Sequence, residues 1–169
     1  MFLNIACVAV NLDTYMEGHA IEAVEILYSM VRRNLQAGTR GRFTVFTDNP
    51  SAFEHMGGVQ TKLIPEGVTG WWAKLFLFSP DAFPKGERVL YFDLDTCITG
   101  PLDEIAAYDG PFAILRDVYR PKGLQSSVMA WEAGNWTQLF WHRWLQQGKP
   151  ELKGGDQAWI EEFWIQGSV

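Results

Sequence analysis

Hydrophobic and polar positions form two kinds of pattern along this chain. Short apolar runs bounded by turn residues are typical of strands, and apolar residues recurring every three or four positions are typical of helices. These patterns predict strands at 4–10, 42–47, 60–64, 89–92, 112–115 and 126–131, and helices at 16–34, 51–56, 71–78, 101–105, 135–147 and from 154 onward. Strands and helices that alternate in this way indicate an α/β fold. We therefore expect a three-layer α/β/α sandwich with a mixed, mostly parallel central sheet.

The most informative stretch is 88–99, in which an apolar run ends in two carboxylates, Asp93 and Asp95. Residues 89–92 fit a strand buried on both faces of the sheet, so the acids follow at its carboxyl end, where open α/β sheets bind ligands. Because side chains alternate along extended chain, both acids should point the same way. Their mutual repulsion then favours a bound cation such as Mg²⁺ or Mn²⁺. The alternative for such a pair is a loop cap at a strand end.

Composition excludes several other classes of protein. A chain of 169 residues with 47% hydrophobic and 20% charged residues fits a single globular domain, 1–169. A net charge of -6 argues against nucleic-acid binding and polybasic membrane binding, since both need clustered Lys and Arg. We expect no signal peptide, no transmembrane segment and a cytoplasmic location. Cys7 and Cys97 fall at predicted strand or strand-end positions, where free buried thiols are expected.

Five short segments carry the remaining functional signal. They are 13–18 (Asp-Thr-Tyr-Met-Glu-Gly), Lys74-Leu75, 88–96 together with 101–104, 125–129 (Gln-Ser-Ser-Val-Met) and Gly155-Asp156-Gln157. In this order they resemble the motifs of GT-A fold glycosyltransferases of the glycogenin and lipopolysaccharide galactosyltransferase type, glycosyltransferase family 8. The resemblance implies transfer of a sugar from a nucleotide-diphosphate sugar, a UDP-sugar in this family, with retention of anomeric configuration. The acceptor would be a glycan, a lipid-linked glycan or a protein.

The resemblance also implies roles for individual residues. The residues that would contact the nucleoside follow the first strand: Val10, Asn11, Asp13 and Tyr15. The metal, Mn²⁺ or Mg²⁺, would bridge the donor phosphates from Asp93 and Asp95, with Lys74 adding a point charge beside the phosphates or the sugar. The residues that would face the sugar are Gln125 and Ser126 at its hydroxyls, and Asp156 with Gln157 on its reactive side.

The chain departs from the family pattern at three places. Gln125 replaces an Asn and Ser127 a Gly, which leaves the sugar open, and Leu12 replaces a polar residue. The family's C-terminal His-x-x-Gly-x-x-Lys-Pro-Trp element, whose histidine completes the metal shell, does not follow the Asp156-Gln157 pair. We therefore expect either a chain truncated before that element or a metal shell completed by water and donor phosphate.

Each candidate residue also has a purely structural interpretation. Lys74 could snorkel from an apolar helix, Asp156 could cap the last helix, and Tyr15 could pack at a helix entry. The adjacent Trp71 and Trp72 could form the lip of an acceptor site, although burial against the helix that they precede is favoured.

Two other functions fit parts of the same sequence. Residues 91–96 also resemble the Asp-x-Asp-x-Thr motif of haloacid-dehalogenase-like phosphatases, in which Asp93 would be the nucleophile and Asp95 the general acid. That motif normally lies on the first strand of its domain, whereas three strands are predicted before it here. A non-catalytic, sugar-nucleotide-binding relic domain is the second alternative, because the C-terminal element is missing.

Overall fold

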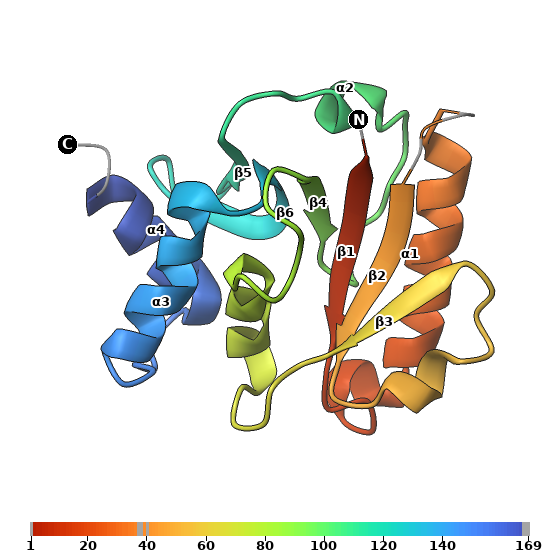
Figure 1. Cartoon of the computed structure of the whole chain (residues 1–169), viewed down its shortest axis with the longest axis horizontal. Helices are drawn as coiled ribbons and strands as arrows, with labels where there is room; N and C mark the ends of the chain where they lie inside the picture. Colours follow the sequence, from red (N-terminus) through yellow and green to blue (C-terminus); the bar gives the residue numbers. More distant parts are fainter. Residues whose placement is uncertain (1, 37–38, 40, 167–169) are drawn as a thin grey trace.

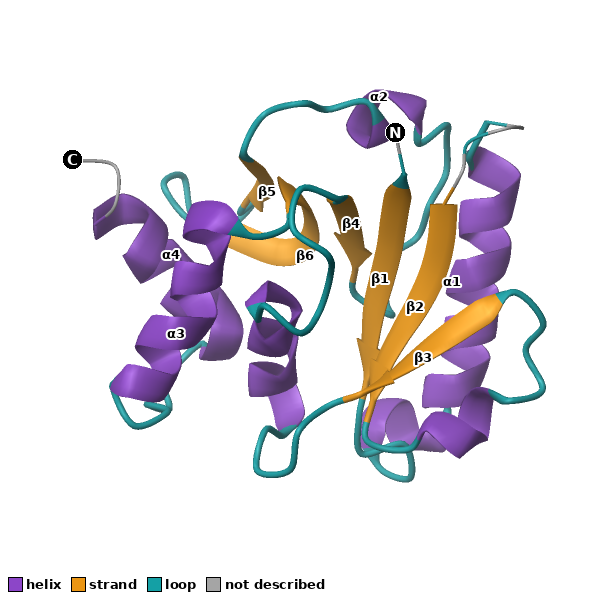
Figure 2. Cartoon of the chain, in the orientation of Figure 1, coloured by secondary structure: helices purple, strands orange, loops and turns teal. Residues whose placement is uncertain are grey.

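The computed structural model describes residues 2–36, 39 and 41–166 (Figures 1 and 2). Within these residues, six strands form one sheet in the order β3-β2-β1-β4-β6-β5. The strands are β1 (Leu3–Ala9), β2 (Gly41–Thr47), β3 (Val59–Leu63), β4 (Arg88–Phe92), β5 (Phe112–Arg116) and β6 (Leu124–Glu132). β1 to β4 run parallel, and β6 is antiparallel to both β4 and β5. The expected mixed, mostly parallel sheet is confirmed.

Helices cover the two faces of this sheet. α1 (Ala20–Asn34) packs on one face, and η3 (Gly70–Phe78), α3 (Gln138–Gln146) and α4 (Gly155–Gln166) pack on the other. Alternate residues of β1 serve the two layers: Ile5 and Cys7 belong to the core against α1, whereas Ala6 belongs to the core against η3. Figure 1 shows α1 on the opposite side of the molecule from α3 and α4. The three layers predicted from the hydrophobic pattern are present.

The first predicted helix begins later than its pattern indicates. Residues Tyr15–Gly18 form a separate 3-10 turn, η1, and α1 starts at Ala20. Met16 and Glu17 have φ angles of 53° and 55°, a left-handed conformation that no α-helix contains. The continuous helix expected over 16–34 is therefore wrong at its first turn, and this turn is what carries Tyr15 to the edge of the sheet.

Other short elements are also tighter or shifted. The expected helix at 51–56 is a 3-10 turn, η2 (Pro50–Phe53), and the helix expected from 135 begins as η4 (Asn135–Thr137). α2 (Asp103–Ala106) starts two residues after Pro101, so the proline precedes the helix instead of opening it. None of these shifts changes the layers of the fold.

Aromatic side chains fill the core between the sheet and α3. Phe140 is fully buried, with ring centroids 4.8 Å from both Phe78 and Phe163. Trp144, one turn further along α3, is also buried. These rings pack between α3 and the sheet, so they stabilise the fold and are not available as a ligand-binding row.

The two thiols differ in their surroundings. Cys7 is buried in β1, and burial together with the charge of Asp93 raises the pKa of its thiol far above the ordinary value. Cys97 lies in the loop after β4 and is exposed, so its expected burial is wrong.

Among the described residues, no helix combines the length and the apolar character that crossing a membrane requires.

Candidate functional site

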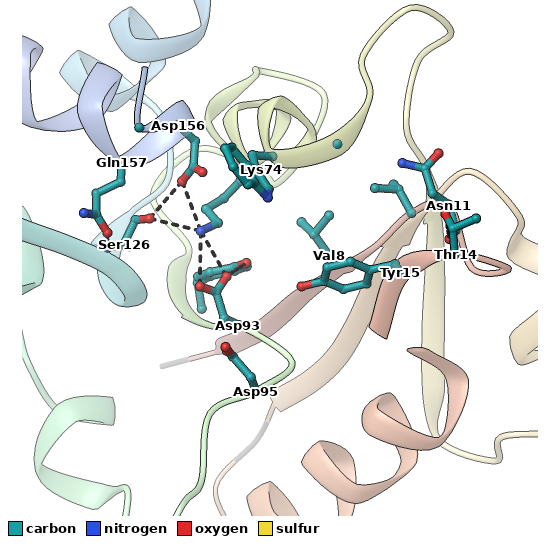
Figure 3. Close-up of a pocket in the computed structure, with 15 residues that line it drawn as sticks. Val8, Asn11, Thr14, Tyr15, Lys74, Asp93, Asp95, Ser126, Asp156 and Gln157 are labelled. Carbon is teal, nitrogen blue, oxygen red and sulfur yellow. Dashed lines mark hydrogen bonds and ion pairs between the residues drawn. The ribbon is translucent and has the colours of Figure 1, made fainter. Parts of the chain in front are cut away.

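A cavity of about 590 Å³ opens at the edge of the sheet where the parallel strands β1 and β4 end. Its lining comes from β1, the η1 turn, η3, β4, β6 and the start of α4 (Figure 3). The residues that line it are Val8, Val10, Asn11, Thr14, Tyr15, Gly70, Trp71, Lys74, Tyr91, Asp93, Asp95, Ser126, Gly154, Asp156 and Gln157. Segments far apart in the sequence therefore meet at the position expected for a ligand site in an open α/β sheet.

Asp93 is held at the end of β4 by its backbone and by a neighbouring side chain. Its amide donates to the Ser127 carbonyl at 2.8 Å, which extends the pairing of β4 with β6 by one residue. The Tyr91 hydroxyl donates to the Asp93 carboxylate. Burial raises the pKa of Tyr91 well above its ordinary value, and the charge of Asp93 and this hydrogen bond raise it further. Tyr91 therefore remains a protonated donor that orients the carboxylate.

Lys74 is the centre of a buried ionic cluster. Its Nζ lies 3.0 Å from Asp93 Oδ1, 3.0 Å from Asp156 Oδ2 and 3.0 Å from Ser126 Oγ (Figure 3). Ser126 Oγ in turn donates to Asp156 Oδ2 at 2.8 Å. An ammonium has three donors, so this cluster satisfies all of them. The interpretation of Lys74 as a snorkelling side chain is therefore wrong, because its charged group points into the protein and not to solvent.

Two opposing effects set the protonation of Lys74. Burial lowers its pKa, but the negative charges of Asp156 and Asp93 and their hydrogen bonds outweigh burial and leave the pKa above its ordinary value. Lys74 thus carries a full positive charge wherever the protein is folded near neutral pH. That charge neutralises part of an otherwise acidic cavity.

This raised pKa predicts a loss of stability only at strongly alkaline pH. A pKa that is higher in the folded than in the unfolded chain gives stability that is complete below the unfolded value of about 10.4 and is lost as the pH rises through the folded pKa. The difference in unfolding free energy between the wild type and Lys74→Met should thus be constant from about pH 6 to about pH 9 and shrink above about pH 10.5. Chemical denaturation across this range measures it, and a difference that already shrinks near neutral pH would contradict the assignment.

Asp95 differs from Asp93 in having no partner among the described residues. Its side chain is exposed at the cavity, and within the described residues it makes no hydrogen bond or ion pair. The chain turns directly after β4, with the Thr96 amide donating to the Asp93 carbonyl at 3.1 Å. The strand alternation used to orient the two acids therefore stops at Phe92, and a turn, not extended chain, brings Asp95 to the cavity beside Asp93.

The other end of the cavity is formed by the turn after β1. Asn11 has a φ of 55°, its amide donates to Asp48 Oδ2 at 2.9 Å, and its carbonyl accepts from the amides of Thr14 and Tyr15. This compact turn places the Tyr15 ring in the cavity (Figure 3). Burial, followed by the charges of Asp93 and Asp95, raises the pKa of Tyr15. The side chain is thus a neutral ring near the acids, and packing at a helix entry does not describe it.

Two of the predicted binding residues lie outside this cavity. Asp13 lines a separate depression of about 470 Å³ together with Asp48 and Asn49. Gln125 lines a smaller cavity of about 280 Å³ that adjoins the main one and shares Asp93, Asp95 and Gln157 with it. The remaining predicted residues, Val10, Asn11, Tyr15, Lys74, Asp93, Asp95, Ser126, Asp156 and Gln157, all line the main cavity.

The beginning of α4 joins this site to β6. Asp156 lies in the first turn of α4 and is only 6% exposed, because Lys74 and Ser126 surround its carboxylate. The next residue, Gln157, accepts a hydrogen bond from the Ser126 amide at its Oε1, at 3.3 Å. A capping role alone does not account for Asp156, whose oxygen is used by the ionic cluster across the cavity.

Sequence reasoning missed several lining residues, Tyr91 and Thr14 among them. Tyr91 could have been found, because it precedes Asp93 by two residues and side chains two apart on a strand share a face. Trp71 is 67% exposed at the cavity, so the burial favoured for it is wrong, whereas Trp72 is stacked on Trp144 with centroids 5.7 Å apart. Thr14 had no signal other than its place in the polar turn.

Removal of the Tyr91 hydroxyl should cost a moderate amount of stability. Tyr91→Phe leaves Asp93 with Lys74 as its remaining partner, so we expect a loss of about 1.5–3 kcal/mol, the range for a hydrogen bond to a charged group. Tyr108→Phe is the matched control, because its hydroxyl donates to a neutral carbonyl, that of Phe112, at 3.1 Å. Urea denaturation should show the larger loss for Tyr91→Phe, and equal losses would contradict the role given to this contact.

The acids fit a cation only if other ligands complete its shell. Within the described part of the chain, no group of three or more His, Cys, Asp or Glu side chains is placed to hold a metal ion. Asp95 has no partner in the part of the chain that the structure describes, and Asp93 retains acceptor capacity, since a carboxylate offers about four lone-pair positions and Tyr91 and Lys74 contact it three times. Mg²⁺ is commonly held by one or two carboxylates together with substrate phosphates and water. The residues therefore fit a cation shared with a phosphate ligand.

Comparison with known proteins identifies the fold. No protein-family model and no curated protein matches the chain. The crystal structure of the glycosyltransferase GlyE in Streptococcus pneumoniae TIGR4 matches it with a TM-score of 0.69 at 17% identity, over 95% of this chain and 42% of that one. The apo form of GlyE matches with a TM-score of 0.66 at 18% identity, over the same shares of the two chains. The chain thus has the fold of this glycosyltransferase and spans less than half of its length.

Proposed function

We propose that this chain is a glycosyltransferase domain that binds a nucleotide-diphosphate sugar, a UDP-sugar, with Mn²⁺ or Mg²⁺ at Asp93 and Asp95. It transfers the sugar, with retention, to a glycan, lipid-linked glycan or protein acceptor. The observation that carries the proposal is the unpaired Asp95 beside a Lys74-bound Asp93, at the carboxyl edge of the sheet in a cavity of about 590 Å³. The resemblance to the glycogenin and lipopolysaccharide galactosyltransferase type, and the fold shared with GlyE, support the same activity.

The two ends of the cavity suit the two ends of such a donor. Asn11 and Tyr15 lie at one end, and Ser126 and Gln157 lie at the other, with the acids between them (Figure 3). A nucleoside is flat and partly apolar, so it suits the Tyr15 end, whereas a sugar needs hydrogen-bonding groups, which Ser126 and Gln157 supply. The diphosphate then lies across the acids, where a bound divalent ion would balance its charge and Lys74 offsets part of the charge of the acids themselves.

The residues of this chain each have a distinct task in the proposed reaction. A divalent ion, when bound, offsets the negative charge that develops on the leaving diphosphate. Tyr91 and Lys74 hold Asp93 in one orientation, so that its remaining acceptor positions face the cavity. Asp156, fixed by Lys74, keeps a negative charge near the sugar end, where positive character at the anomeric carbon is stabilised.

The phosphatase alternative fits the cavity less well. Three contacts from Tyr91 and Lys74 draw electron density from the Asp93 carboxylate, which makes it a poorer nucleophile toward phosphorus although it retains an acceptor position. Asp93 also follows the fourth strand of the chain, β4, instead of the first. Release of phosphate from p-nitrophenyl phosphate, lost in Asp93→Asn, would nevertheless favour this alternative over glycosyl transfer.

Calorimetric titration with UDP, with and without Mn²⁺, tests the binding step directly. We expect binding that strengthens at least about tenfold when Mn²⁺ is present, because the acids otherwise repel the diphosphate. Incubation with UDP-glucose and UDP-galactose then tests turnover through release of UDP. Binding without turnover of any donor would indicate the non-catalytic relic, and no UDP binding under either condition would contradict both sugar-nucleotide functions.

A further inference from the structure

Two adjacent tryptophans on η3 have opposite environments. Trp72 is partly buried and packs against the core, where it is stacked on Trp144 at an interplanar angle of 14°. Trp71 is 67% exposed and lines the cavity. Exposure of so large an apolar side chain costs free energy that burial would recover. Trp71 and Trp72 are the same type of residue, so the difference in their exposure comes from their positions alone. The exposed ring therefore calls for an explanation beyond stability.

Although it is exposed, the Trp71 ring contacts the backbone at the start of α4. A β-carbon at Gly155 would come within 2.6 Å of the Trp71 Cε3 atom, so only glycine lets the indole lie against the backbone here. The Gly155 φ of 64° also belongs to the left-handed region that glycine adopts most easily. Gly155, which has no side chain, thus leaves the space in which the Trp71 indole lies against the backbone at the start of α4.

This support places Trp71 at the sugar end of the cavity. Gly155 directly precedes Asp156, and Trp71 precedes Lys74 by three residues, the spacing at which side chains of a 3-10 helix lie above one another. Lys74 and Asp156 are ion-paired with their atoms 3.0 Å apart. The indole therefore lies one helical turn outward from the buried charge cluster, between that cluster and solvent.

An exposed indole beside carboxylates has the chemistry of a saccharide platform. The face of an aromatic ring carries negative charge density, which attracts the weakly positive C–H groups on one face of a pyranose. Asp156 and Ser126 are 6% and 3% exposed and so lie deeper than Trp71. A donor sugar that contacts Asp156 and Ser126 therefore leaves the indole uncovered. An acceptor saccharide that enters the cavity from solvent would contact this indole first.

We propose that Trp71 is the stacking platform of the acceptor site and that the acceptor of this chain is a saccharide, which excludes a bare protein side chain. The proposal rests on the proposed glycosyl transfer and names its acceptor class. It assigns a binding role to a residue outside the metal, phosphate and donor-sugar contacts described above. A glycan or a lipid-linked glycan fulfils it equally, since both present a pyranose ring.

Fluorine NMR of protein labelled with 5-fluorotryptophan tests the contact itself. The chain has eight tryptophans, and Trp71→Phe identifies the resonance of Trp71. Titration with methyl β-glucoside, methyl β-galactoside and methyl α-mannoside, in the presence of UDP and Mn²⁺, should shift this resonance for at least one of them. Tyr119→Ala, which removes an exposed aromatic ring remote in sequence and outside the cavity lining, should leave that shift unchanged.

Kinetics with the saccharide that produces the shift provides the second test. Trp71→Ala should raise the KM for the saccharide by about tenfold more than the KM for the donor, the size expected for one lost aromatic contact. Trp71→Phe, which keeps a smaller ring, should raise it less. A change in donor KM equal to or larger than that in saccharide KM would assign Trp71 to the donor sugar and overturn the proposal.

The outcomes separate this proposal from the proposed function. Mn²⁺-dependent UDP binding without any saccharide-induced shift at Trp71 would overturn the saccharide acceptor while leaving glycosyl transfer intact. Absence of UDP binding would overturn the proposed function itself. A saccharide-induced shift of the Trp71 resonance, with the resonances of Trp72 and the other tryptophans unchanged, is the result that supports the platform most directly.

Discussion

Lys74→Met is expected to destabilise the fold by about 3–5 kcal/mol, because it removes the cation from a buried cluster and leaves two carboxylates facing each other. Asp93 and Asp156 both lie 3.0 Å from the Lys74 ammonium, and Asp156 is only 6% exposed. Methionine restores the volume of the lysine stem but not its charge, so the loss reports electrostatics more than packing. Urea denaturation at neutral pH measures the change in unfolding free energy.

Two further variants separate this explanation from a general effect of losing a lysine. Lys122→Met, in an exposed loop, should change stability by no more than about 0.5 kcal/mol. Lys74→Met combined with Asp156→Asn should recover part of the loss, since one of the two unpaired charges is then absent. If the double variant is less stable than Lys74→Met alone, carboxylate repulsion is not the cause, and the cluster has been assigned the wrong role.

Asp95→Ala is expected to abolish metal-dependent donor hydrolysis while leaving the fold intact. Loss of an outer-shell partner of a metal ligand commonly lowers metal affinity or activity by about 10–100-fold, so loss of a direct ligand should cost at least about 100-fold. Asp95 is exposed and makes no hydrogen bond or ion pair with the described residues, so stability should change by no more than about 0.5 kcal/mol. Release of UDP from UDP-glucose or UDP-galactose over a range of Mn²⁺ concentrations measures the effect.

The control for this variant is another exposed aspartate outside the cavity. Asp109→Ala removes the same group from the loop before β5 and should retain wild-type hydrolysis and Mn²⁺ dependence. Circular dichroism of both variants shows whether the fold is retained. Full turnover in Asp95→Ala at every Mn²⁺ concentration would mean that the carboxylate does not hold the metal, and the mechanism would have to rely on Lys74 as the sole positive charge at the diphosphate.

Local sequence was sufficient for the elements that bury a regular apolar face. β4 is an uninterrupted apolar run after Arg88, and α1 repeats its buried residues at helical spacing from Ala20 onward. Both patterns are periodic over neighbours in the chain, so they need no knowledge of distant partners. The position of Asp93 and Asp95 at a strand end follows from the same run, so the amino-acid sequence alone was enough to identify the candidate acids.

The local hydrophobic pattern did not predict the structure where the backbone leaves a regular helix or strand conformation. The left-handed φ angles of Met16 and Glu17 interrupt a stretch whose side-chain pattern is helical, and neither side chain predicts a left-handed conformation. Asp95 lines the same cavity as Asp93, as expected, but strand alternation is not the reason, because the strand ends at Phe92 and a turn begins. In both cases the backbone conformation departs from the one that the side-chain pattern predicts.

By itself, therefore, the sequence determined the layers of the fold, the mostly parallel sheet and the acids at its central edge, because each depends on side chains close together along the chain. Only the tertiary structure decided that Lys74 binds Asp93 and Asp156, that Asp13 and Gln125 lie in neighbouring cavities, and that Trp71 is exposed while Trp72 is partly buried against the core. Lys74 and Ser126 are 52 residues apart, and their contact exists only because η3 and β6 pack on the same sheet edge. Such contacts depend on how separate elements meet, which hydrophobic periodicity does not encode.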